Sequence, residues 1–242
     1  MLNIRGYDIT PSFLASRMDY AVVKQDMTLE EVNHHISECI RLKVNSFNCN
    51  PHYLEYISKG LEGSGVPATV CVDIPYGAGT PTAKFKAAEE MIRRGAKGLD
   101  TILDFAAVKN KNWRLLEEEA KNFVKAAQGF DTKMIIECHL LTKEEIVAVT
   151  KICEEAGISY VKTGSGSVTG PEWTDILLIR ETLAPNSKTR IKFSGTGRYW
   201  TSLVALTGFA LGADLIGSRS TSQIIADLPK IEALFRRVQI TA

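Results

Sequence analysis

Short apolar runs rich in β-branched residues alternate with amphipathic segments along nearly the whole chain. Runs of this length and composition are typical of buried strands in a parallel sheet, and the segments between them are typical of helices that cover such a sheet. The midpoints of successive runs are roughly 24 to 35 residues apart, close to the span of about 30 residues for one strand with its crossover helix. We expect strands at residues 17–22, 44–49, 69–74, 98–104, 133–138, 159–164, 190–194 and 214–218.

The segments between the predicted strands carry helix start and stop signals. Threonines that precede an acidic pair or a proline mark three helix starts, at Thr28, Thr80 and Thr142. Glycines mark two helix ends, at Gly95 and Gly157. Eight strands, each followed by a helix, predict an α/β fold, a (β/α)8 TIM barrel formed as a single domain by residues 1–242. The alternative is an open doubly wound sheet. It is disfavoured because no GxGxxG motif follows an early strand and the glycine-rich stretch 164–170 comes late.

Ionisable residues interrupt five of the predicted strands, although strands of a parallel sheet are normally apolar. If Ile191 and Phe193 face the helices, the alternation of side chains along a strand turns Lys192 and Ser194 toward the barrel axis. The same argument turns Lys162 inward. In a barrel the reacting groups lie at the C-terminal ends of the strands. The ionisable positions are Asp19, Asp100, Glu137, Lys162 and Lys192.

The two inward lysines are expected on adjacent strands, with their ammonium groups about 4–6 Å apart because neighbouring strands are about 4.8 Å apart. Two like charges 4 Å apart repel by roughly 4 kcal/mol at an effective dielectric of about 20. Such repulsion lowers the pKa of one of the lysines by about two units or more and favours a neutral amine that attacks a carbonyl. The alternative is an interior salt-bridge network of these lysines with Asp19, Asp100 and Glu137.

Three glycine-rich turns follow the last three predicted strands. Small residues expose backbone N–H groups, and a helix N-terminus adds positive partial charge, so these turns are candidates for binding a phosphate or carboxylate. The loops after strands 7 and 8 are also the usual phosphate site of this fold. The candidate residues are Ser165, Ser194, Gly195, Thr196, Gly217, Ser218, Arg219 and Ser220.

The composition of the chain limits the kinds of partner that the protein is expected to bind. Twenty-nine Lys and Arg against 28 Asp and Glu leave a formal charge of +1, so we expect no nucleic-acid partner. Apolar stretches are shorter than the roughly 20 residues of a membrane span, and the N-terminus has no signal-peptide pattern, so we expect a cytoplasmic protein without membrane contact. Five cysteines without a CxxC pair indicate buried, reduced thiols, and the four histidines lack metal-ligand spacing.

Several segments resemble those of one enzyme family. VKTGSG around Lys162 is similar to the family's VKTSTG, and IKFSGTGR around Lys192 to its VKASGGIR. GLDTILD around Asp100 is similar to EIDMVIN, and IIECHLL at 135–141 to IIETCLL, while NPHYL at 50–54 and MDYAVVK at 18–24 add support. From about Asp19 to Ser220 the chain resembles the deoxyribose-phosphate aldolase family of class I aldolases.

The resemblance implies that Lys162 forms a Schiff base, that Lys192 lowers the pKa of Lys162, and that Asp100 transfers a proton. The reaction would be the reversible cleavage of 2-deoxy-D-ribose 5-phosphate to acetaldehyde and glyceraldehyde 3-phosphate, with no metal or organic cofactor. Two alternatives remain: a lysine-dependent aldolase or acyl-cleaving enzyme for another sugar phosphate or keto acid, and a non-catalytic barrel that binds sugar phosphates. A homo-oligomer is also expected. The substrate-binding candidates are Asp19, Asn48, Asp104, Glu137, Ser165, Ser194, Gly195, Thr196, Gly217, Ser218, Arg219 and Ser220.

The chain departs from the family pattern around the expected substrate pocket, and the C-terminal tyrosine of some members is missing. Arg219 would either tighten a phosphate clamp or meet a carboxylate, and Asp104 would favour a substrate rich in hydroxyl groups. The true substrate is therefore open. The departures are Tyr20, Ala21, Asn48, Asp104, Gly164, Ser165, Thr196, Arg219 and Ser220.

Overall fold

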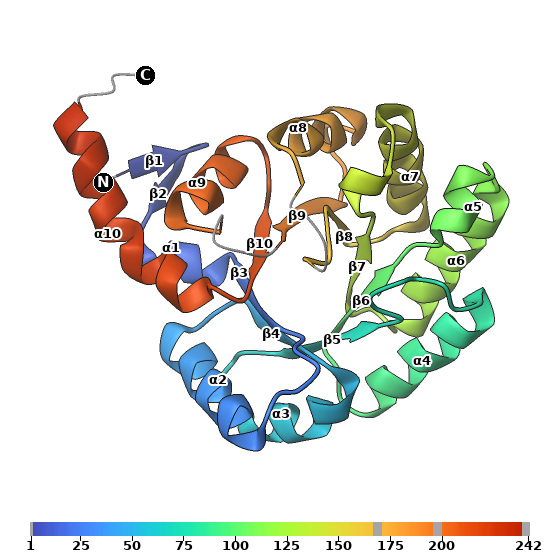
Figure 1. Ribbon diagram of the computed structural model, residues 1–242, viewed down its shortest axis with the longest axis horizontal. Helices are drawn as coiled ribbons and strands as arrows, with labels where there is room; N and C mark the ends of the chain where they lie inside the picture. Colours follow the sequence, from blue (N-terminus) through green and yellow to red (C-terminus); the bar gives the residue numbers. More distant parts are fainter. Residues whose placement is uncertain (1, 167–170, 196–199, 239–242) are drawn as a thin grey trace.

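A closed barrel of eight parallel strands forms the centre of the molecule (Figure 1). The structure is a computed structural model that describes residues 2–166, 171–195 and 200–238. Strand β10 pairs with both β9 and β3, which closes the ring, so the prediction of a (β/α)8 barrel is confirmed and the open sheet is wrong. In ring order from β3 the strands are β3 (Met18–Val22), β4 (Ser46–Cys49), β5 (Ala68–Val72), β6 (Gly98–Ile102), β7 (Asp131–Ile135), β8 (Tyr160–Lys162), β9 (Arg190–Ser194) and β10 (Leu215–Ser218).

Helices surround the barrel, and several begin at the predicted caps. Thr28 and Thr142 each form a capping box with a glutamate three residues later, and Thr80 caps a helix that begins at Pro81. Gly157 ends its helix with φ at 81°. The helices are α2 (Leu29–Leu42), α3 (Leu54–Gly60), α4 (Pro81–Arg93), α5 (Phe105–Lys109), α6 (Trp113–Ala126), α7 (Lys143–Ala156), α8 (Trp173–Thr182), α9 (Ser202–Ala210) and α10 (Thr221–Val238), with short 3-10 turns at Pro51–Tyr53 and Cys138–Leu140.

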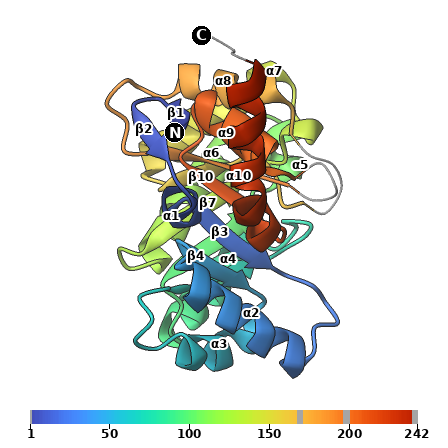
Figure 2. The ribbon, with the colours of Figure 1, turned by 90° about the vertical axis from the view of Figure 1, so that its left-hand side faces the viewer.

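An N-terminal hairpin precedes the barrel and was not predicted. Strands β1 (Leu2–Ile4) and β2 (Tyr7–Ile9) pair antiparallel, and α1 (Pro11–Ser16) leads from them into β3. The hairpin lies beside α9 (Figure 2), where the Arg5 guanidinium donates hydrogen bonds to the backbone carbonyls of Phe209 and Ala213. It therefore packs against the outer helices near the C-terminal end of α9.

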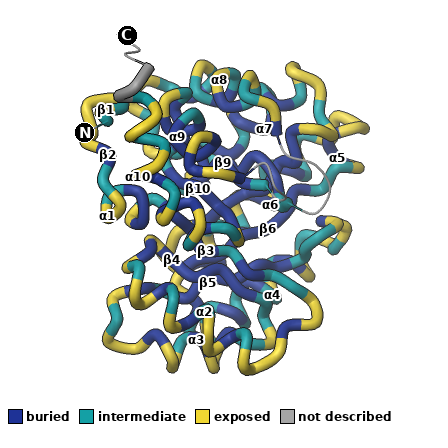
Figure 3. Tube along the Cα trace, turned by 60° about the vertical axis from the view of Figure 1, so that its left-hand side comes forward, coloured by how far each residue is buried: buried dark blue, intermediate teal, exposed yellow. Residues whose placement is uncertain are grey.

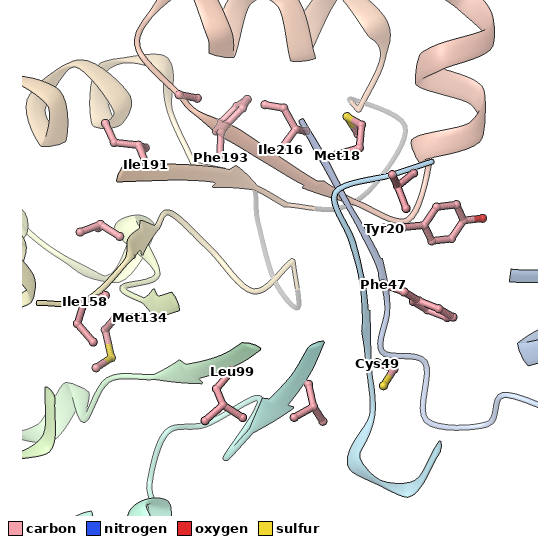
Figure 4. Close-up of a cluster of buried hydrophobic side chains, with 14 of the residues drawn as sticks. Met18, Tyr20, Phe47, Cys49, Leu99, Met134, Ile158, Ile191, Phe193 and Ile216 are labelled. Carbon is pink, nitrogen blue, oxygen red and sulfur yellow. The ribbon is translucent and has the colours of Figure 1, made fainter. Parts of the chain in front are cut away.

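The two faces of the barrel strands differ in chemistry. Outward-facing side chains are apolar and fill the space under the helices, so the strands are buried while the outer helix surfaces are exposed (Figure 3). Phe193, for example, packs against the rings of Trp173 and Trp200, as its predicted orientation requires. Labelled residues of this layer in Figure 4 include Met18, Phe47, Leu99, Met134, Ile191 and Ile216. The inward faces carry the charged residues described below.

Two further sequence expectations concern the rest of the chain. All five cysteines are free and buried, as expected for structural thiols. Within the described residues, no helix is both long enough and apolar enough to cross a membrane.

Candidate active site

The closed ring of strands brings five charged side chains together inside the barrel. Lys162 on β8 is paired with Lys192 on β9, and Asp100 on β6 is paired with Lys133 on β7. Asp19 lies on β3. None of the five is more than 4% exposed. The barrel interior therefore holds an ionic cluster of three lysines and two aspartates.

Asp100 is at the centre of this cluster. Its Oδ2 accepts hydrogen bonds from Lys162 Nζ at 2.7 Å and from Lys192 Nζ at 2.9 Å, and its Oδ1 lies 3.2 Å from Lys133 Nζ. Because Lys162 and Lys192 share one oxygen atom, their nitrogens lie within about 6 Å of each other, the range in which charges shift pKa values strongly. The predicted proximity of the two lysines is confirmed.

Asp19 forms the second anionic position. It accepts hydrogen bonds from Lys192 Nζ and, at 2.8 Å, from Ser46 Oγ, and it lies 3.6 Å from Lys133 Nζ. The alternative of an interior salt-bridge network is thus correct for Asp19 and Asp100, whereas Glu137 does not belong to it. Three lysines face two carboxylates, which leaves one positive charge in excess when all five groups are ionised.

Lys133 was missed in the sequence. It begins the predicted strand 133–138, where a charge is unremarkable, but the strand runs from Asp131 to Ile135 and Lys133 is at its middle. The alternation of side chains along a strand could have revealed it. Lys133 and Glu137 are four residues apart, so a strand that turns Glu137 inward also turns Lys133 inward.

The cluster fixes the ionisation of its deeper members. Burial alone would raise the pKa of Asp100, but Lys133, Lys162 and Lys192 outweigh it and hold the pKa well below its usual value. Burial likewise opposes the ionised form of Asp19, and Lys192 and Lys133 keep its pKa low. Burial also opposes the charged form of Lys192, yet Asp100 and Asp19 raise its pKa. Lys192 is therefore not the lysine whose pKa crowding was expected to lower, because two carboxylates contact it.

Asn48 holds the remaining oxygen of Asp100. Its Nδ2 donates to Asp100 Oδ1 at 2.9 Å and to Thr69 Oγ1 at 3.0 Å, and the thiol of Cys71 donates to its Oδ1 at 2.8 Å. Burial raises the pKa of Cys71 to about 12, so the thiol keeps its proton. Asn48 is fully buried and lies beneath the pocket rather than in its wall. In this structure its amide orients Asp100.

Lys162 opens onto a pocket of about 160 Å³, while Lys133 and Lys192 lie below it with 2% and 0% exposure. Gly217 makes room for the deeper lysine, because a Cβ atom there would lie 2.7 Å from Lys192 Cε. The pocket is formed by the turns after β3, β8, β9 and β10, and is lined by Ala21, Val23, Lys24, Lys162, Ser165, Gly166, Ser194, Gly195, Gly217, Ser218 and Arg219. Lys24 in this wall was also missed in the sequence.

The other predicted site residues take distinct positions. Ser194 Oγ donates to the carbonyl of Gly164 at 2.6 Å and so joins two of the turns. Asp104 lies farther out, where its Oδ1 caps α5 by accepting from Ala107 N. The backbone N–H of Ser220 donates to Ser218 Oγ at 3.0 Å. Thr196 lies outside the described residues.

Glu137 was predicted within a strand but follows β7, with φ at 41° in the left-handed region. Its Oε1 accepts from the backbone N–H of Ser165 at 2.9 Å, and its Oε2 lies 3.4 Å from His139 Nδ1. A non-glycine residue in this conformation is uncommon, and such strain is found most often near functional sites. Glu137 therefore fixes the turn that follows Lys162.

Comparisons with known proteins agree with this geometry. The chain is 34% identical over 213 residues to the deoxyribose-phosphate aldolase of Clostridium tetani, covering 87% of this chain and 96% of that protein. It is 32% identical over 209 residues to the enzyme of the same name from Streptococcus pneumoniae serotype 19F, covering 86% and 93%. The tetrameric deoxyribose phosphate aldolase of Aeropyrum pernix shares the fold, with a TM-score of 0.81 and 22% identity over 92% of this chain and 93% of that one. No family model matches the chain.

Proposed function

The chain belongs to the deoxyribose-phosphate aldolase family, and from this premise we propose that it cleaves 2-deoxy-D-ribose 5-phosphate through a Schiff base on Lys162. The products are acetaldehyde and glyceraldehyde 3-phosphate. The names of the curated relatives support the reaction. The arrangement of the ionic cluster supports the assignment of the nucleophile.

One observation supports Lys162 above the other lysines: it is the lysine of the cluster that lines the pocket. The cluster carries one cation more than it has carboxylates. Loss of a proton from Lys162 leaves two ammonium groups against two carboxylates and removes the excess charge. Lys192, with its raised pKa, stays an ammonium ion and opposes a second charge nearby. A neutral amine at Lys162 is the form that attacks a carbonyl carbon.

The steps follow from these positions. Lys162 Nζ adds to the aldehyde carbon of the opened sugar, and loss of water gives an iminium ion. Asp100, directly or through a water held with Lys192, takes the proton from the hydroxyl on the third carbon. The bond between the second and third carbons then breaks, its electron pair enters the iminium to form an enamine, and glyceraldehyde 3-phosphate leaves. Protonation of the enamine and hydrolysis release acetaldehyde and free Lys162.

We assign the phosphate to the opposite wall of the same pocket. Gly195, Gly217 and Ser218 offer close backbone approach, and Arg219 offers a guanidinium that matches phosphate oxygens. A panel of sugar phosphates and keto acids, compared by kcat/KM, separates deoxyribose 5-phosphate from the substrates of a related lysine aldolase. We also propose a homo-oligomer, supported by the tetramer of the Aeropyrum pernix enzyme and tested by light scattering.

Borohydride trapping tests the nucleophile. We incubate the protein with acetaldehyde, reduce with borohydride and map the modified peptide by mass spectrometry. The expected result is one ethyl group on Lys162 and none on Lys133 or Lys192. An adduct on another lysine of the cluster would transfer the assignment to it, and no adduct together with no turnover would favour a non-catalytic barrel that binds sugar phosphates.

A further inference from the structure

A small cavity lies at the end of the barrel opposite the catalytic pocket. Three residues of its wall fix its position, because Arg17 directly precedes β3, Arg190 begins β9 and Asp214 directly precedes β10. The cavity therefore lies at the N-terminal ends of the strands. We call it the base pocket and define it by these three residues and Arg5, with apolar side chains of the hairpin, α1 and α9 between them. The proposed substrate lies at the other end of the barrel and leaves the base pocket without a ligand.

The wall of the base pocket is cationic. It contains the side chains of Arg5, Arg17 and Arg190, and a guanidinium group keeps its charge at any pH at which proteins are folded. Asp214 lies 3.8 Å from Arg5, and it also accepts a hydrogen bond from a backbone N–H group of β9. Asp131 accepts a hydrogen bond from Arg190 at 3.0 Å. Three guanidinium groups thus share two carboxylates, and an anion in the cavity would offset the repulsion that remains.

Arg17 is the arginine of this wall without a carboxylate. Its Cζ lies 5.7 Å from the centre of the Tyr7 ring and 5.5 Å from that of the Phe13 ring, and the two rings stack on each other. Such cation–π contacts use the charge of Arg17 and leave its N–H groups without an acceptor. Across residues 2–166, 171–195 and 200–238, no group accepts a hydrogen bond from this guanidinium. Arg17 is half-buried, so its donors are held in place and available to a ligand.

The size and the donors of the base pocket fit a phosphate group. Its volume is about 80 Å³, which leaves room for one tetrahedral oxyanion, whereas the catalytic pocket proposed for a whole sugar phosphate has about 160 Å³. Guanidinium groups match the oxygens of phosphate with paired N–H donors. A dianion also balances more of the excess charge than a carboxylate would. Any body attached to the phosphate would lie outside the cavity, beside the exposed ring of Tyr7.

The base pocket also joins the N-terminal hairpin to the barrel. Arg5 lies in the hairpin turn, whereas Arg17 and Arg190 lie at the ends of barrel strands. A two-stranded hairpin is at best marginally stable by itself, so a ligand bound by both parts would hold the hairpin in place. We propose that the base pocket is a second anion site, which binds a phosphate group and fastens the hairpin to the barrel. This inference goes beyond the proposed aldolase function and does not depend on it.

The test compares thermal midpoints in inorganic phosphate and in sodium chloride at matched ionic strength. Arg219→Gln is the reference protein, because it weakens phosphate binding in the catalytic pocket. Phosphate at about ten times its Kd should raise the midpoint of this reference by about 3–6 °C. Adding Arg17→Gln or Arg190→Gln should weaken phosphate binding about 10-fold or more and remove most of the rise, because each deletes charge-assisted hydrogen bonds. Adding Arg93→Gln is the matched control, an exposed arginine of α4 that lines neither pocket.

Hydrogen exchange locates the bound phosphate. We expect phosphate to slow amide exchange in residues 2–9 of the reference protein, and to have no such effect once Arg17→Gln is added. Glycerol 3-phosphate then identifies the kind of ligand. A smaller rise than with inorganic phosphate supports free phosphate, and an equal rise supports a phosphate ester whose body lies outside the cavity.

Three results would overturn the inference. They are an equal rise in sodium chloride, an unchanged rise in a folded variant that carries Arg17→Gln or Arg190→Gln, and a rise without slower exchange in residues 2–9. Melting curves without phosphate show that each variant is folded. The aldolase function is tested separately, because Arg17→Gln alone should still give the borohydride-trapped adduct on Lys162. Absence of the adduct from both wild type and Arg17→Gln would contradict the aldolase function and leave the base pocket unaffected.

Discussion

Two buried lysine–carboxylate clusters lie on opposite sides of the barrel wall. Inside the ring, Lys133, Lys162 and Lys192 contact Asp19 and Asp100. Outside it, Lys84 on α4 donates to Glu119 on α6 at 2.7 Å and to the carbonyl of Ile102 at 2.9 Å, and lies 3.5 Å from Asp73. The inner cluster is nearly inaccessible, and so are Lys84 and Glu119, while Asp73 is 25% exposed. The inner cluster has an excess of cations and the outer one an excess of carboxylates.

The difference indicates a chemical role for the inner cluster and a structural role for the outer one. In the inner cluster the lysines hold the pKa of Asp100 well below its usual value. In the outer cluster burial outweighs Lys84 and raises the pKa of Glu119. Lys162 opens onto a pocket, whereas Lys84 is closed between two helices and the end of β6. A buried lysine therefore becomes a candidate nucleophile when cations outnumber carboxylates around it and a substrate can reach it.

Replacing the lysine on each side gives the sharpest contrast. Lys162→Met should lower kcat by roughly 10⁴-fold or more, because removal of the nucleophile of a covalent mechanism abolishes the pathway. Its thermal midpoint should stay near that of wild type, because Asp100 keeps its contacts with Lys133 and Lys192 and Met fills a similar volume at the edge of the pocket. Steady-state assays with deoxyribose 5-phosphate measure the rate. A loss of less than 10-fold would move the nucleophile elsewhere.

Lys84→Met should have the opposite profile. Removing one partner of a buried ion pair leaves Glu119 without its cation and costs about 3–5 kcal/mol of unfolding free energy. Denaturant unfolding measures this loss, and borohydride trapping of the folded variant should still modify Lys162. Loss of trapping in a folded Lys84→Met variant would contradict the conclusion that the outer cluster serves stability alone.

Lys192→Met tests the cation that stays charged. Because Asp100 and Asp19 raise the pKa of Lys192, it is an ammonium ion throughout the working range. In the proposed mechanism this cation favours the free amine of the nucleophile. We expect kcat to fall about 10²-fold and the low-pH limb of the rate profile to move to higher pH. A rate profile that keeps its low-pH limb would show that Lys192 does not promote the free amine.

Acid unfolding compares the carboxylates of the two clusters. Asp19 has a folded-state pKa below its usual 3.8, so its contribution to stability is present above that pH and is lost as pH falls. Glu119 has the opposite sign, because its pKa is raised from 4.5 and its contribution is lost as pH rises. Below about pH 4, Asp19→Asn should reduce the slope of unfolding free energy against pH, with an upper limit of about 1.4 kcal/mol per pH unit for one group, and Glu119→Gln should leave this slope unchanged. Urea unfolding at a series of pH values measures both slopes.

Asn48→Ala has the smallest expected effect. It removes one hydrogen bond to Asp100 and lets the carboxylate turn away from Lys162, for a cost of about 10-fold in kcat with little change in KM. Thr69→Val is the matched control, because it removes a partner of Asn48 without touching Asp100. If Asn48→Ala raises KM instead, Asn48 contacts the substrate, as we first expected from the sequence.

The barrel could be predicted from the chain because its strands are buried on their outer face and recur at a regular spacing. Seven of the eight expected strands overlap the observed ones closely, while the fifth, 133–138, is displaced from Asp131–Ile135. The displacement arose because the apolar run continues through Ile136, beyond the last strand residue. The N-terminal hairpin was missed because strands of three residues carry too short a pattern to register.

The site could be predicted only in part. Lys162, Lys192 and Asp100 stand out because a charge inside an apolar strand is rare, and their parity indicates a common direction. What the sequence does not contain is the pairing across the ring, and for that reason the contacts of Lys133 with both aspartates and of Asn48 with Asp100 were not foreseen. Likewise, the raised pKa of Lys192 depends on two carboxylates from strands far away in the chain.

The site is sensitive to substitution at Gly217, although this residue carries no reactive group. The hydrogen at its Cα leaves a space that the side chain of Lys192 occupies, and one methyl group there would overlap that side chain. The proposed covalent chemistry thus depends on the missing side chain of Gly217 as much as on any amine or acid. With alanine at this position, the barrel and every proposed catalytic side chain would be kept, but Lys192 would have to move from its place beside Asp100. A residue without a functional group thus limits which substitutions the site can accept.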